Sequence, residues 1–398
     1  MSSSSSPSHP RIAIIGGGPG GLTLLLTLHN RGIPATLYER EASFSSRAHQ
    51  GGTLDLGYDS GQRALRDNGL AALFAQHSRP EGDTNRFADS QKILGMVDAD
   101  PNQDPRDLRP EIDRSILRKI MLDAMPADAV KWGHALTSVR SLEGSGGAHE
   151  LTFANGHTAV CDVLVGADGA FSRVRPLVTS VVPIYHGVTG AEISLAPETV
   201  KLPELRETVE MVGRGSMWAV DKQRMLGAQI NGSGRIRTYV WFLGPADWVL
   251  PADPAEARKA LLERYDGWAP ALRKLIEHCD PAAMHPRPLY HLPTDHRWEH
   301  VDGVTLLGDA AHLMSPFAGA GANLAMLDGL ELGIVLADVV ASGKGTKERE
   351  AAIAEWEEAR MSEGRRVGAI AMRNLEGTFS VEGPSTDMAM DPELRRRA

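Results

Sequence analysis

Three glycines near the N-terminus have the spacing of a phosphate-binding turn. Gly16, Gly18 and Gly21 form the pattern Gly-x-Gly-x-x-Gly between a short apolar run at 11–15 and a segment of helical character. The first glycine of such a turn permits a tight bend, the second lets a pyrophosphate approach the backbone, and the third lets helix and strand pack closely. The N–H groups that begin the helix also attract anionic phosphates. A glycine-rich turn that binds no ligand is the alternative interpretation.

Glu39 is the carboxylate that we expect to bind ribose hydroxyls. It follows the next apolar run, IPATLY, so that strand, turn, helix and strand make one βαβ unit. A carboxylate at this point of such a unit binds the ribose of a dinucleotide. Because it also disfavours a 2′-phosphate, the site is predicted to hold FAD or NAD and not NADP. The sequence contains one such pattern, so either a single nucleotide cofactor is bound permanently, or a second binds without its own Rossmann domain.

Two further acidic residues, Asp168 and Asp309, each follow an apolar run that closes on a turn. They lie in GADGAFSRVR (166–175) and GDAAHLMSPFAGAGANLAM (308–326). If both runs are parallel strands, the two carboxylates lie at the carboxyl edge of one sheet, where α/β proteins bind their ligands. For Asp168, an ordinary Asp-Gly turn without function remains the open alternative.

The residues after Asp309 predict an accessible loop followed by a helix. Pro316, Gly319 and Gly321 delay the helix and leave the intervening backbone accessible. We expect the helix to begin at about Ala322, with its first N–H groups directed at any ligand beside it. A reduced flavin carries negative charge on its pyrimidine edge. This segment is therefore predicted to supply backbone groups and an electrostatic field, and not a nucleophile.

Bulk properties exclude several classes of function. The 398 residues suit one large or two interleaved domains, and the net charge of -9 argues against nucleic-acid and anionic-membrane partners. No apolar run is long enough to span a membrane, and MSSSSSPSHP lacks the features of a signal peptide. Cys161 and Cys279 are far apart and are expected to be buried free thiols. We expect a cytoplasmic protein.

Local signals place several secondary-structure elements. The Asn-Gly pair at 155–156 predicts a hairpin, and QINGSGRIRTYVWFL predicts a second one. Asp253, followed by proline and then by glutamate at the third helical position, is typical of a capped helix start. Asp113 is expected to cap a helix over about 113–124.

In their order and spacing, these motifs resemble those of the class A FAD-dependent aromatic hydroxylases. The shared series is GxGxxG, GADG with a downstream arginine, and GDAAH followed by PFAGxGxN, and the resemblance covers about 10–375. Within this group, GGTLDLGYDSGQRALRDNGL (51–70), EIDRSILRKIMLDAM (111–125) and GDAAHLMSPFAG are most similar to the tetracycline-inactivating flavin monooxygenases, or tetracycline destructases.

The expected fold class is α/β, with a Rossmann-like FAD-binding domain, an inserted and mainly antiparallel β domain for substrate, and a long C-terminal helix. The FAD-binding domain is expected to comprise 11–75, 106–180 and 286–345, and the substrate domain 76–105 and 181–285. The remaining segments are a disordered leader (1–10), a bridging helix (346–380) and a tail (381–398).

The resemblance also implies which residues contact the cofactor. Glu39 and the glycine turn would bind the ADP half of FAD, while Arg47 and Asp55 would lie near the flavin. Arg118 would reach the ribityl or phosphate region, and Asp309 would bind the ribityl chain. The complete expected set is Gly16, Gly18, Pro19, Gly20, Gly21, Glu39, Arg40, Arg47, Asp55, Arg118, Asp168, Asp309, Pro316, Gly319, Gly321, Ala322 and Asn323.

A reaction follows from the same resemblance. NADPH reduces tightly bound FAD and leaves, and Asp168 would support contacts to NADPH or to the flavin. O2 then forms a flavin C4a-hydroperoxide, which gives one oxygen atom to an electron-rich substrate. The flavin does this chemistry, so no certain catalytic side chain and no metal ligand are expected. The single Gly-x-Gly-x-x-Gly pattern agrees with transient binding of NADPH.

The sequence departs from the family pattern in two places. PFAGQG has become PFAGAG, so Ala320 lacks an amide beside the flavin, which is expected to enlarge or dry the cavity while leaving cofactor binding intact. Tetracycline-binding members use a glutamine, an arginine and a histidine of the substrate sheet. A rough alignment places Gly190, a glycine-rich segment near Gly215, and Arg237 there instead. The substrate is therefore expected to be another polyphenolic or polyketide-like molecule, with tetracycline left open.

Candidate substrate contacts come mainly from the inserted β domain. Trp218, Tyr239 and Trp241 alternate on expected strands and could wall an aromatic cavity or belong to the core. His312 could be a general base, but a histidine whose hydrogen bonds are satisfied within the loop is favoured. The expected substrate residues are Gly190, Trp218, Arg237, Tyr239, Trp241 and Phe317.

The leading hypothesis is an FAD-dependent monooxygenase that consumes NADPH and O2 and hydroxylates an aromatic or polyketide-type small molecule. We expect it to act as a monomer, without nucleic-acid or membrane partners. Epoxidation, Baeyer–Villiger oxidation and dehydrogenation remain open, because related FAD enzymes share the fold. A flavin-fold protein that sequesters a ligand without turnover is the non-enzymatic alternative.

Overall fold

A parallel sheet forms the centre of the larger half of the molecule. The structure, a computed structural model, describes residues 9–47, 51–98, 100, 102–142, 144 and 147–381. The strand order is β19-β11-β1-β2-β7. The strands are β1 (Ile12–Ile15), β2 (Ala35–Tyr38), β7 (Val130–Lys131), β11 (Val163–Gly166) and β19 (Val304–Leu306). β1 and β11 are apolar, β19 is apolar apart from Thr305, and all three are wholly buried, as expected for parallel strands covered on both faces.

This sheet is the middle of three layers. Ile12 and Ile14 of β1 point to one face, where they pack against helices α1 (Pro19–Asn30), α4 (Arg114–Asp123) and α10 (Gly321–Ala341). Ala13 and Ile15 point to the other face, because successive side chains of a strand alternate. There they pack against an antiparallel sheet made of β8 (Leu136–Ser141), β9 (His149–Phe153) and β10 (Thr158–Cys161).

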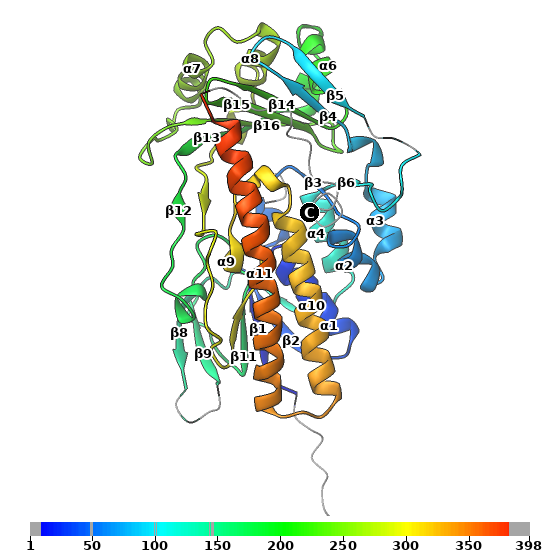
Figure 1. Cartoon of the computed structure of the whole chain (residues 1–398), viewed down its shortest axis with the longest axis vertical. Coiled ribbons are helices and arrows are strands. Elements are labelled where there is room, and N and C mark those ends of the chain that lie inside the picture. The colour runs from blue at the N-terminus through cyan, green and yellow to red at the C-terminus, as the bar shows by residue number, and fades with distance from the viewer. Residues whose placement is uncertain are drawn as a thin grey trace, which may run out of the picture.

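A seven-stranded sheet lies at the other end of the molecule (Figure 1), in the order β17-β13-β16-β15-β14-β4-β5. Its strands are β4 (Asn85–Ala88), β5 (Ile93–Val97), β13 (Val188–Leu195), β14 (Ser216–Asp221), β15 (Arg224–Ile230), β16 (Ile236–Leu243) and β17 (His285–Pro286). The outer face is apolar and is covered by α6 (Arg206–Val212), α7 (Pro254–Arg264) and α8 (Pro270–Glu277). The opposite face, here called the inward face, looks toward the parallel sheet.

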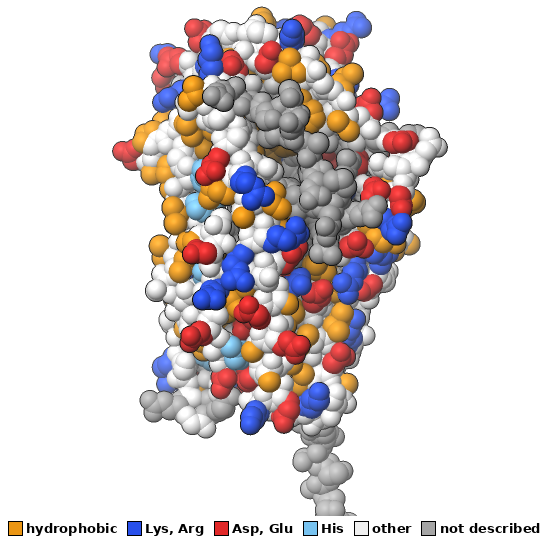
Figure 2. Space-filling model, in the orientation of Figure 1, with side chains coloured by type: hydrophobic (Ala, Val, Ile, Leu, Met, Phe, Trp, Pro, Cys, Tyr) orange, Lys and Arg blue, Asp and Glu red, His pale blue; other side chains and the backbone are white. Residues whose placement is uncertain are grey.

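Helix α11 (Thr346–Thr378) links the two large sheets. In its first half, Glu357 accepts a hydrogen bond from the hydroxyl of Thr305 on β19, at 2.7 Å. Near its end, Leu375 packs with Trp241 of β16. Figure 1 shows α11 running along the molecule beside α10, and Figure 2 shows acidic and basic side chains interspersed over this face.

Shorter elements complete the described chain. They are the 3-10 turns Phe44–Arg47, Pro80–Gly82, Arg175–Leu177, Pro203–Leu205, Pro281–Ala283 and Pro316–Ala318, the helices α2 (Gly61–Asp67), α3 (Ala71–His77), α5 (Pro197–Val200) and α9 (Asp309–His312), and the strands β3 (Thr53–Asp55), β6 (Glu111–Asp113), β12 (Ile184–Tyr185) and β18 (Tyr290–His291).

Most local expectations are confirmed, and one is wrong. Both expected hairpins form, as β9–β10 and β15–β16. Asp253 caps α7 by accepting from the N–H groups of Ala255 and Glu256. Asp113 does not cap α4 with its side chain. Its carboxylate instead accepts from the N–H of Gly232 at 3.1 Å, because β6 packs beside the β15–β16 turn.

The remaining expectations concern the two ends of the chain, the domain limits, the cysteines and membrane-spanning helices. Most of the leader and all of the tail after 381 lie outside the described residues. The expected limits of the two domains remain a prediction, although β4 and β5 do join the sheet formed by β13–β16. Cys161 and Cys279 are buried free thiols, as expected. Among the described helices, none is long and apolar enough to cross a membrane.

Candidate cofactor and substrate site

The glycine-rich turn has the geometry that its sequence predicts. Gly16 has a φ of +110°, and a Cβ there would lie 2.3 Å from the carbonyl oxygen of Ala167. A Cβ on Gly21 would lie 2.1 Å from the oxygen of Gly16, so only glycine allows α1 to approach the strand this closely. A Cβ on Gly18 would meet nothing within 4 Å. The turn is therefore tight at its ends and open at Gly18, where a phosphate would approach the backbone.

Helices α1 and α10 pack in parallel, with their N-termini at the same end. A Cβ on Gly20 would lie 2.6 Å from the oxygen of Ala325, and one on Gly329 would lie 2.3 Å from the oxygen of Gly20. Further along, a Cβ on Gly333 would lie 2.5 Å from the methyl group of Thr27. No described side chain caps either N-terminus. Two positive helix ends therefore lie together, an arrangement that an anionic ligand would stabilise.

Glu39 lies directly against the glycine turn. Its buried carboxylate accepts hydrogen bonds from the N–H of Gly17 at 2.7 Å and of Glu41 at 3.0 Å. These contacts fix the acid at the edge of the turn. Arg40 is exposed and pairs with Glu41 at 3.5 Å, so its guanidinium is directed along the surface. Arg47 ends the Phe44–Arg47 turn, and its side chain lies outside the described residues.

The Asp168 and Asp309 segments meet at the carboxyl ends of β11 and β19, as predicted. Arg175 connects them: its buried guanidinium donates to the carbonyl oxygens of Ala310 at 2.7 Å and of Asp309 at 2.9 Å. It also donates to the carbonyl oxygens of Ala170 at 2.9 Å and of Gly169 at 3.5 Å. Asp168 accepts from the N–H of Arg173, whereas its Oδ1 has no hydrogen-bond partner among the described residues. Burial raises the pKa of Asp168.

Asp309 is the accessible carboxylate of this region. Its side chain keeps solvent-accessible surface although it lies deep between the two halves. That depth raises the pKa of Asp309, and the cationic groups of His312, Arg114 and Arg175 oppose the rise. A Cβ on Gly321, the first residue of α10, would lie 4.0 Å from Oδ1 of Asp309. An acceptor and a helix N-terminus thus stand side by side.

His312 is held inside the loop, as the sequence favoured. Its Nε2 lies 2.6 Å from Oδ2 of Asp328, which also accepts from the N–H of Gly308 at 2.9 Å. Burial lowers the pKa of His312, but the Asp328 carboxylate outweighs burial and the net shift is upward. Asp328 was missed by the sequence analysis. An aspartate in the otherwise mostly apolar helix LAMLDGLELGIVL is the signal that could have revealed it.

The loop after His312 is tied to the β3 segment by two buried side chains. The amide of Asn323 donates to the carbonyl of Asp55 and accepts from the N–H of Gly57, both at 2.9 Å. The buried Arg109 pairs with the Asp55 carboxylate at 2.8 Å and donates to the oxygen of Gly319 at 3.0 Å. Asn323 therefore offers a ligand its backbone only. Sequence reasoning missed Arg109, because no local pattern distinguishes it.

Pro316 and Gly319 are exposed, and Gly321 and Ala322 are half-buried, so the loop backbone is accessible where the sequence predicted it. The structure contradicts the expectation that Ala320 enlarges or dries the cavity beside the flavin. Its methyl group is buried in an apolar cluster with Leu324 of α10 and with Val367 and Ala371 of α11. It packs against α11 and does not wall an open cavity, so it neither enlarges nor dries one.

The inward face of the seven-stranded sheet brings the expected aromatic residues together. Tyr239 and Trp241 stack, with ring centroids 4.9 Å apart and planes 16° apart. Phe317 of the loop lies 5.8 Å from Trp241. Trp218 is on the same face and donates its indole N–H to Asn85 at 3.1 Å. Trp241 is buried while Tyr239 and Trp218 are half-buried, so this wall is part core and part accessible surface.

A polar cluster lies beside these rings. The buried Glu192 pairs with Arg237 and, at 2.7 Å, with Arg287. Burial alone raises the pKa of Glu192, but the two guanidiniums outweigh it and hold the pKa below its ordinary value. Gly190 has a structural role: its φ is +148°, and a Cβ would lie 1.8 Å from the oxygen of Val240. The close β13–β16 contact therefore explains this glycine.

Arg114 acts electrostatically on both the cofactor loop and the aromatic wall, and sequence reasoning missed it as well. It opens α4, is exposed, and its charge opposes the upward pKa shifts that burial causes at both Asp309 and Tyr239. A cation at a helix N-terminus is electrostatically unfavourable, and that is the signal that could have revealed it. Arg118 lies one turn further, between the rings of Phe44 at 5.7 Å and Trp132 at 5.9 Å.

The family follows from comparison with known proteins. Residues 10–360 match the FAD-binding domain family, and the chain belongs to it. Monooxygenase asqM of Emericella nidulans is 30% identical over 373 residues, covering 81% of this chain and 82% of the relative. The 3-amino-4-hydroxybenzoate 2-monooxygenase PtmB3 of Streptomyces platensis is 30% identical over 91% of this chain and 87% of its own length. The chain is an FAD-dependent monooxygenase of the class A type, as the motifs indicated.

Solved structures agree on the fold. Klebsiella pneumoniae HpxO, crystallised with FAD and uric acid, aligns with a TM-score of 0.76 at 23% identity, over 99% of this chain and 95% of its own. The tetracycline destructase Tet(51) aligns with a TM-score of 0.69 at 19% identity, over 95% and 93%. At these identities the similarity shows the fold alone. The expected likeness to tetracycline destructases is thus present in architecture.

FAD fits the residues of this chain. The turn is open at Gly18, and the N-termini of α1 and α10 lie together without side-chain caps. An anionic pyrophosphate at the first helix and an electron-rich flavin edge at the second would satisfy both. Asp309 offers an accessible acceptor between them.

Proposed function

We propose that the enzyme uses NADPH and O2 to insert one oxygen atom into a planar, electron-rich aromatic or polyketide-type molecule. The substrate binds at the junction, which we define as the region where the loop 309–323 and the β3 segment 51–57 meet the inward face of the seven-stranded sheet. The observation that carries this proposal is the packing of the loop's Phe317 against Trp241, which stacks on Tyr239. A cofactor-side loop and a flat aromatic wall are thereby in contact.

The charge balance at the junction supports an oxygen-rich substrate. Glu192 is one carboxylate between two guanidiniums, Arg237 and Arg287. Arg114 adds a further cation whose charge reaches Tyr239. A net positive environment stabilises a phenolate or enolate and disfavours a cationic ligand. Deprotonation also makes a phenolic ring more electron-rich, which favours attack on an electrophilic oxygen.

Bound FAD, after reduction by NADPH, supplies the activated oxygen, and the protein supplies position and a dry environment. Stacked Tyr239 and Trp241 would hold a flat ring parallel to their own planes. Arg237 and Gln229, which are cross-strand neighbours, would fix a polar edge of the ring. A Cβ on Gly52 would lie 2.7 Å from Oε1 of Gln229 and 2.9 Å from the Tyr239 hydroxyl, so the β3 segment closes this side against water.

The alternatives differ in product or in turnover. Epoxidation and Baeyer–Villiger oxidation also add one oxygen, and dehydrogenation adds none, so the product mass and structure separate them. A protein that only sequesters its ligand would bind it tightly while its FAD was not reduced by NADPH, so NADPH oxidation with substrate separates that alternative.

The test compares Arg237→Lys and Arg237→Gln with Arg224→Gln, whose side chain belongs to β15 of the same sheet and donates to the oxygen of Arg264. Candidate planar phenols, tetracycline included, are screened for stimulation of NADPH oxidation, and the molecular masses of the products are measured by mass spectrometry. We expect a gain of one oxygen and, for Arg237→Gln, a KM raised about 10- to 100-fold, the value of a hydrogen bond to a charged group.

Arg237→Lys should lie between the wild type and Arg237→Gln, because it keeps the charge and loses the planar fork. NADPH oxidation without substrate and the melting temperature report whether the variants remain folded with FAD. An unchanged KM in folded Arg237→Gln would remove Arg237 from substrate binding. A product without added oxygen would overturn the proposed reaction.

A further inference from the structure

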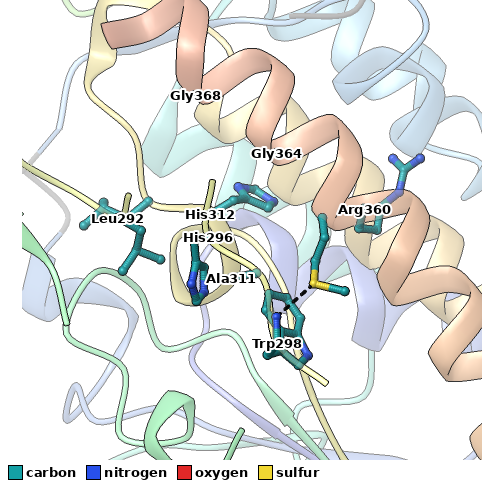
Figure 3. Close-up of a pocket in the computed structure, with 10 residues that line it drawn as sticks. Leu292, His296, Trp298, Ala311, His312, Arg360, Gly364 and Gly368 are labelled. Carbon is teal, nitrogen blue, oxygen red and sulfur yellow. Dashed lines mark hydrogen bonds between the residues drawn. The ribbon is translucent and has the colours of Figure 1, made fainter. Parts of the chain in front are cut away.

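A small cavity lies behind the Asp309 loop, between α9, α11 and the segment 292–298. Its volume is about 20 Å³, and its walls include His296, Trp298, His312, Met361 and Gly364. A cavity needs roughly 10–15 Å³ to hold one water molecule. Figure 3 shows the rings of His296, His312 and Trp298 gathered beside α11, with the guanidinium of Arg360 turned away from them.

Four ring nitrogens of the residues that line this cavity lack partners within the described protein. Neither ring nitrogen of His296, nor Nδ1 of His312, nor the indole nitrogen of Trp298 makes a hydrogen bond to a described residue. His296 and Trp298 are each only 8% exposed. Buried polar groups of this kind are costly unless a partner satisfies them, at about 1–3 kcal/mol each.

Protein contacts fix the walls around these atoms. The N–H of Trp298 lies 3.3 Å from the sulfur of Met361, and the N–H of Leu292 donates to the oxygen of Leu313 at 2.9 Å. A Cβ on Gly364 would lie 2.8 Å from Cβ of His312, so glycine at this position of α11 makes room for the ring. The cavity is therefore a built space and not a loose gap.

We propose that this cavity is a binding site for one water molecule, which accepts hydrogen bonds from His312 and Trp298 and donates to His296. His296 is then a positioning residue for the cofactor loop, because His312 holds Asp328, which holds the N–H of Gly308 beside Asp309. The site is independent of the substrate.

The protonation states agree with this pattern of donors and acceptors. Burial and the nearby Arg175 lower the pKa of His296 to about 4, so its ring is neutral near pH 7 and has an acceptor nitrogen. His312 is the partner of Asp328 and carries an upward net pKa shift, although burial opposes it. An indole nitrogen only donates. One water molecule can therefore bond one nitrogen of each of the three rings.

The test is a crystal structure of the FAD-bound enzyme grown with bromide, together with two matched leucine variants. We expect one peak without anomalous signal, at about 2.7–3.2 Å from a ring nitrogen of His296, from Nδ1 of His312 and from the indole nitrogen of Trp298. A bromide peak would show that the site takes an anion, and an empty cavity would show that it takes nothing. Either result overturns the proposal.

The variants are His296→Leu and the control His149→Leu. His149 is also buried, with Nδ1 unpartnered among the described residues, but it belongs to β9 on the far face of the parallel sheet. Both variants should lower the melting temperature. Only His296→Leu should raise the FAD dissociation constant, by about 2- to 10-fold, the value of a hydrogen bond. His296→Gln should recover part of this loss. Equal FAD affinities in the two leucine variants would contradict a positioning role.

Discussion

Asp309 and Asn323 show how residues of one loop can have different tasks. Both polar atoms of the Asn323 amide make hydrogen bonds, to Asp55 and to Gly57, and these bonds connect the loop to the β3 segment. Asp309 instead retains accessible surface beside the first residue of α10. Asp309 is therefore the side chain of the loop that we expect to bind the cofactor directly.

Replacing Asp309 tests this assignment. Asp309→Ala should weaken FAD binding about 10- to 100-fold, because a hydrogen bond to a charged group contributes about 1.5–3 kcal/mol. FAD affinity is measured by the quenching of flavin fluorescence. Asp302→Ala is the control, because Asp302 precedes β19, the strand that Asp309 follows, and its side chain is 73% exposed. Wild-type affinity in Asp309→Ala would exclude the proposed contact.

Glu111 is a buried acid near the junction. Burial raises its pKa to about 8, Arg79 opposes the rise, and the nearby Asp55 adds to it. Its carboxylate lies 2.9 Å from the Arg79 guanidinium. Because the folded pKa exceeds the ordinary 4.5, the folded protein binds this proton more tightly than the unfolded chain. This contribution to stability is fully present below pH 4.5 and is lost as the pH rises through about 8.

Glu111→Gln should therefore flatten the pH dependence of stability. The amide imitates the protonated acid, so the variant should gain stability over the wild type progressively between pH 5 and pH 9. Melting temperatures measured across this range test the prediction, with the exposed Glu81→Gln as control. Parallel curves for Glu111→Gln and the wild type would show that Glu111 is ionised throughout.

At the scale of elements, the parallel pair α1 and α10 organises the cofactor side. Gly20, Gly329 and Gly333 let the two backbones approach until a single added methyl group would collide. This contact places both helix N-termini at the same end of the molecule, where their fields add. The glycines of α10 thus act on the cofactor site from a distance.

Gly329→Ala tests this packing. Its new methyl group would lie 2.3 Å from the oxygen of Gly20, which should cost about 1–3 kcal/mol of stability and weaken FAD binding. Gly377→Ala on α11 is the matched control, because a Cβ there meets nothing within 4 Å. It should leave FAD affinity unchanged and stabilise the helix by up to about 1 kcal/mol. Equal stability and equal FAD affinity of the two variants would show that the close contact between α1 and α10 is unimportant.

Sequence pattern predicted the elements that local chemistry determines. The glycine turn, the Asn-Gly hairpin and the Asp253 cap each depend on residues that are neighbours in sequence. Asp113 was misassigned because its carboxylate is drawn away by Gly232, more than a hundred residues along the chain. Tertiary partners of this kind override a local capping preference.

For the whole molecule, the junction is assembled from distant segments. Arg109 bonds the loop of Gly319, Arg175 bonds the loop of Asp309, and Phe317 packs on Trp241. Helix α11 contacts both large sheets, the parallel sheet through Glu357 at β19 and the seven-stranded sheet through Leu375. Motif order in the sequence predicted that these segments belong to one site. It did not predict Arg109, Arg114 or Asp328, whose roles depend on contacts formed only after folding.

The most direct test of the central claim is turnover under ¹⁸O2. The purified enzyme is reduced with NADPH in the presence of a planar phenolic substrate that stimulates oxidation, and the product is analysed by mass spectrometry. We expect each product molecule to gain one labelled oxygen atom from O2. A product that carries oxygen from water, or that has lost hydrogen without gaining oxygen, would contradict it.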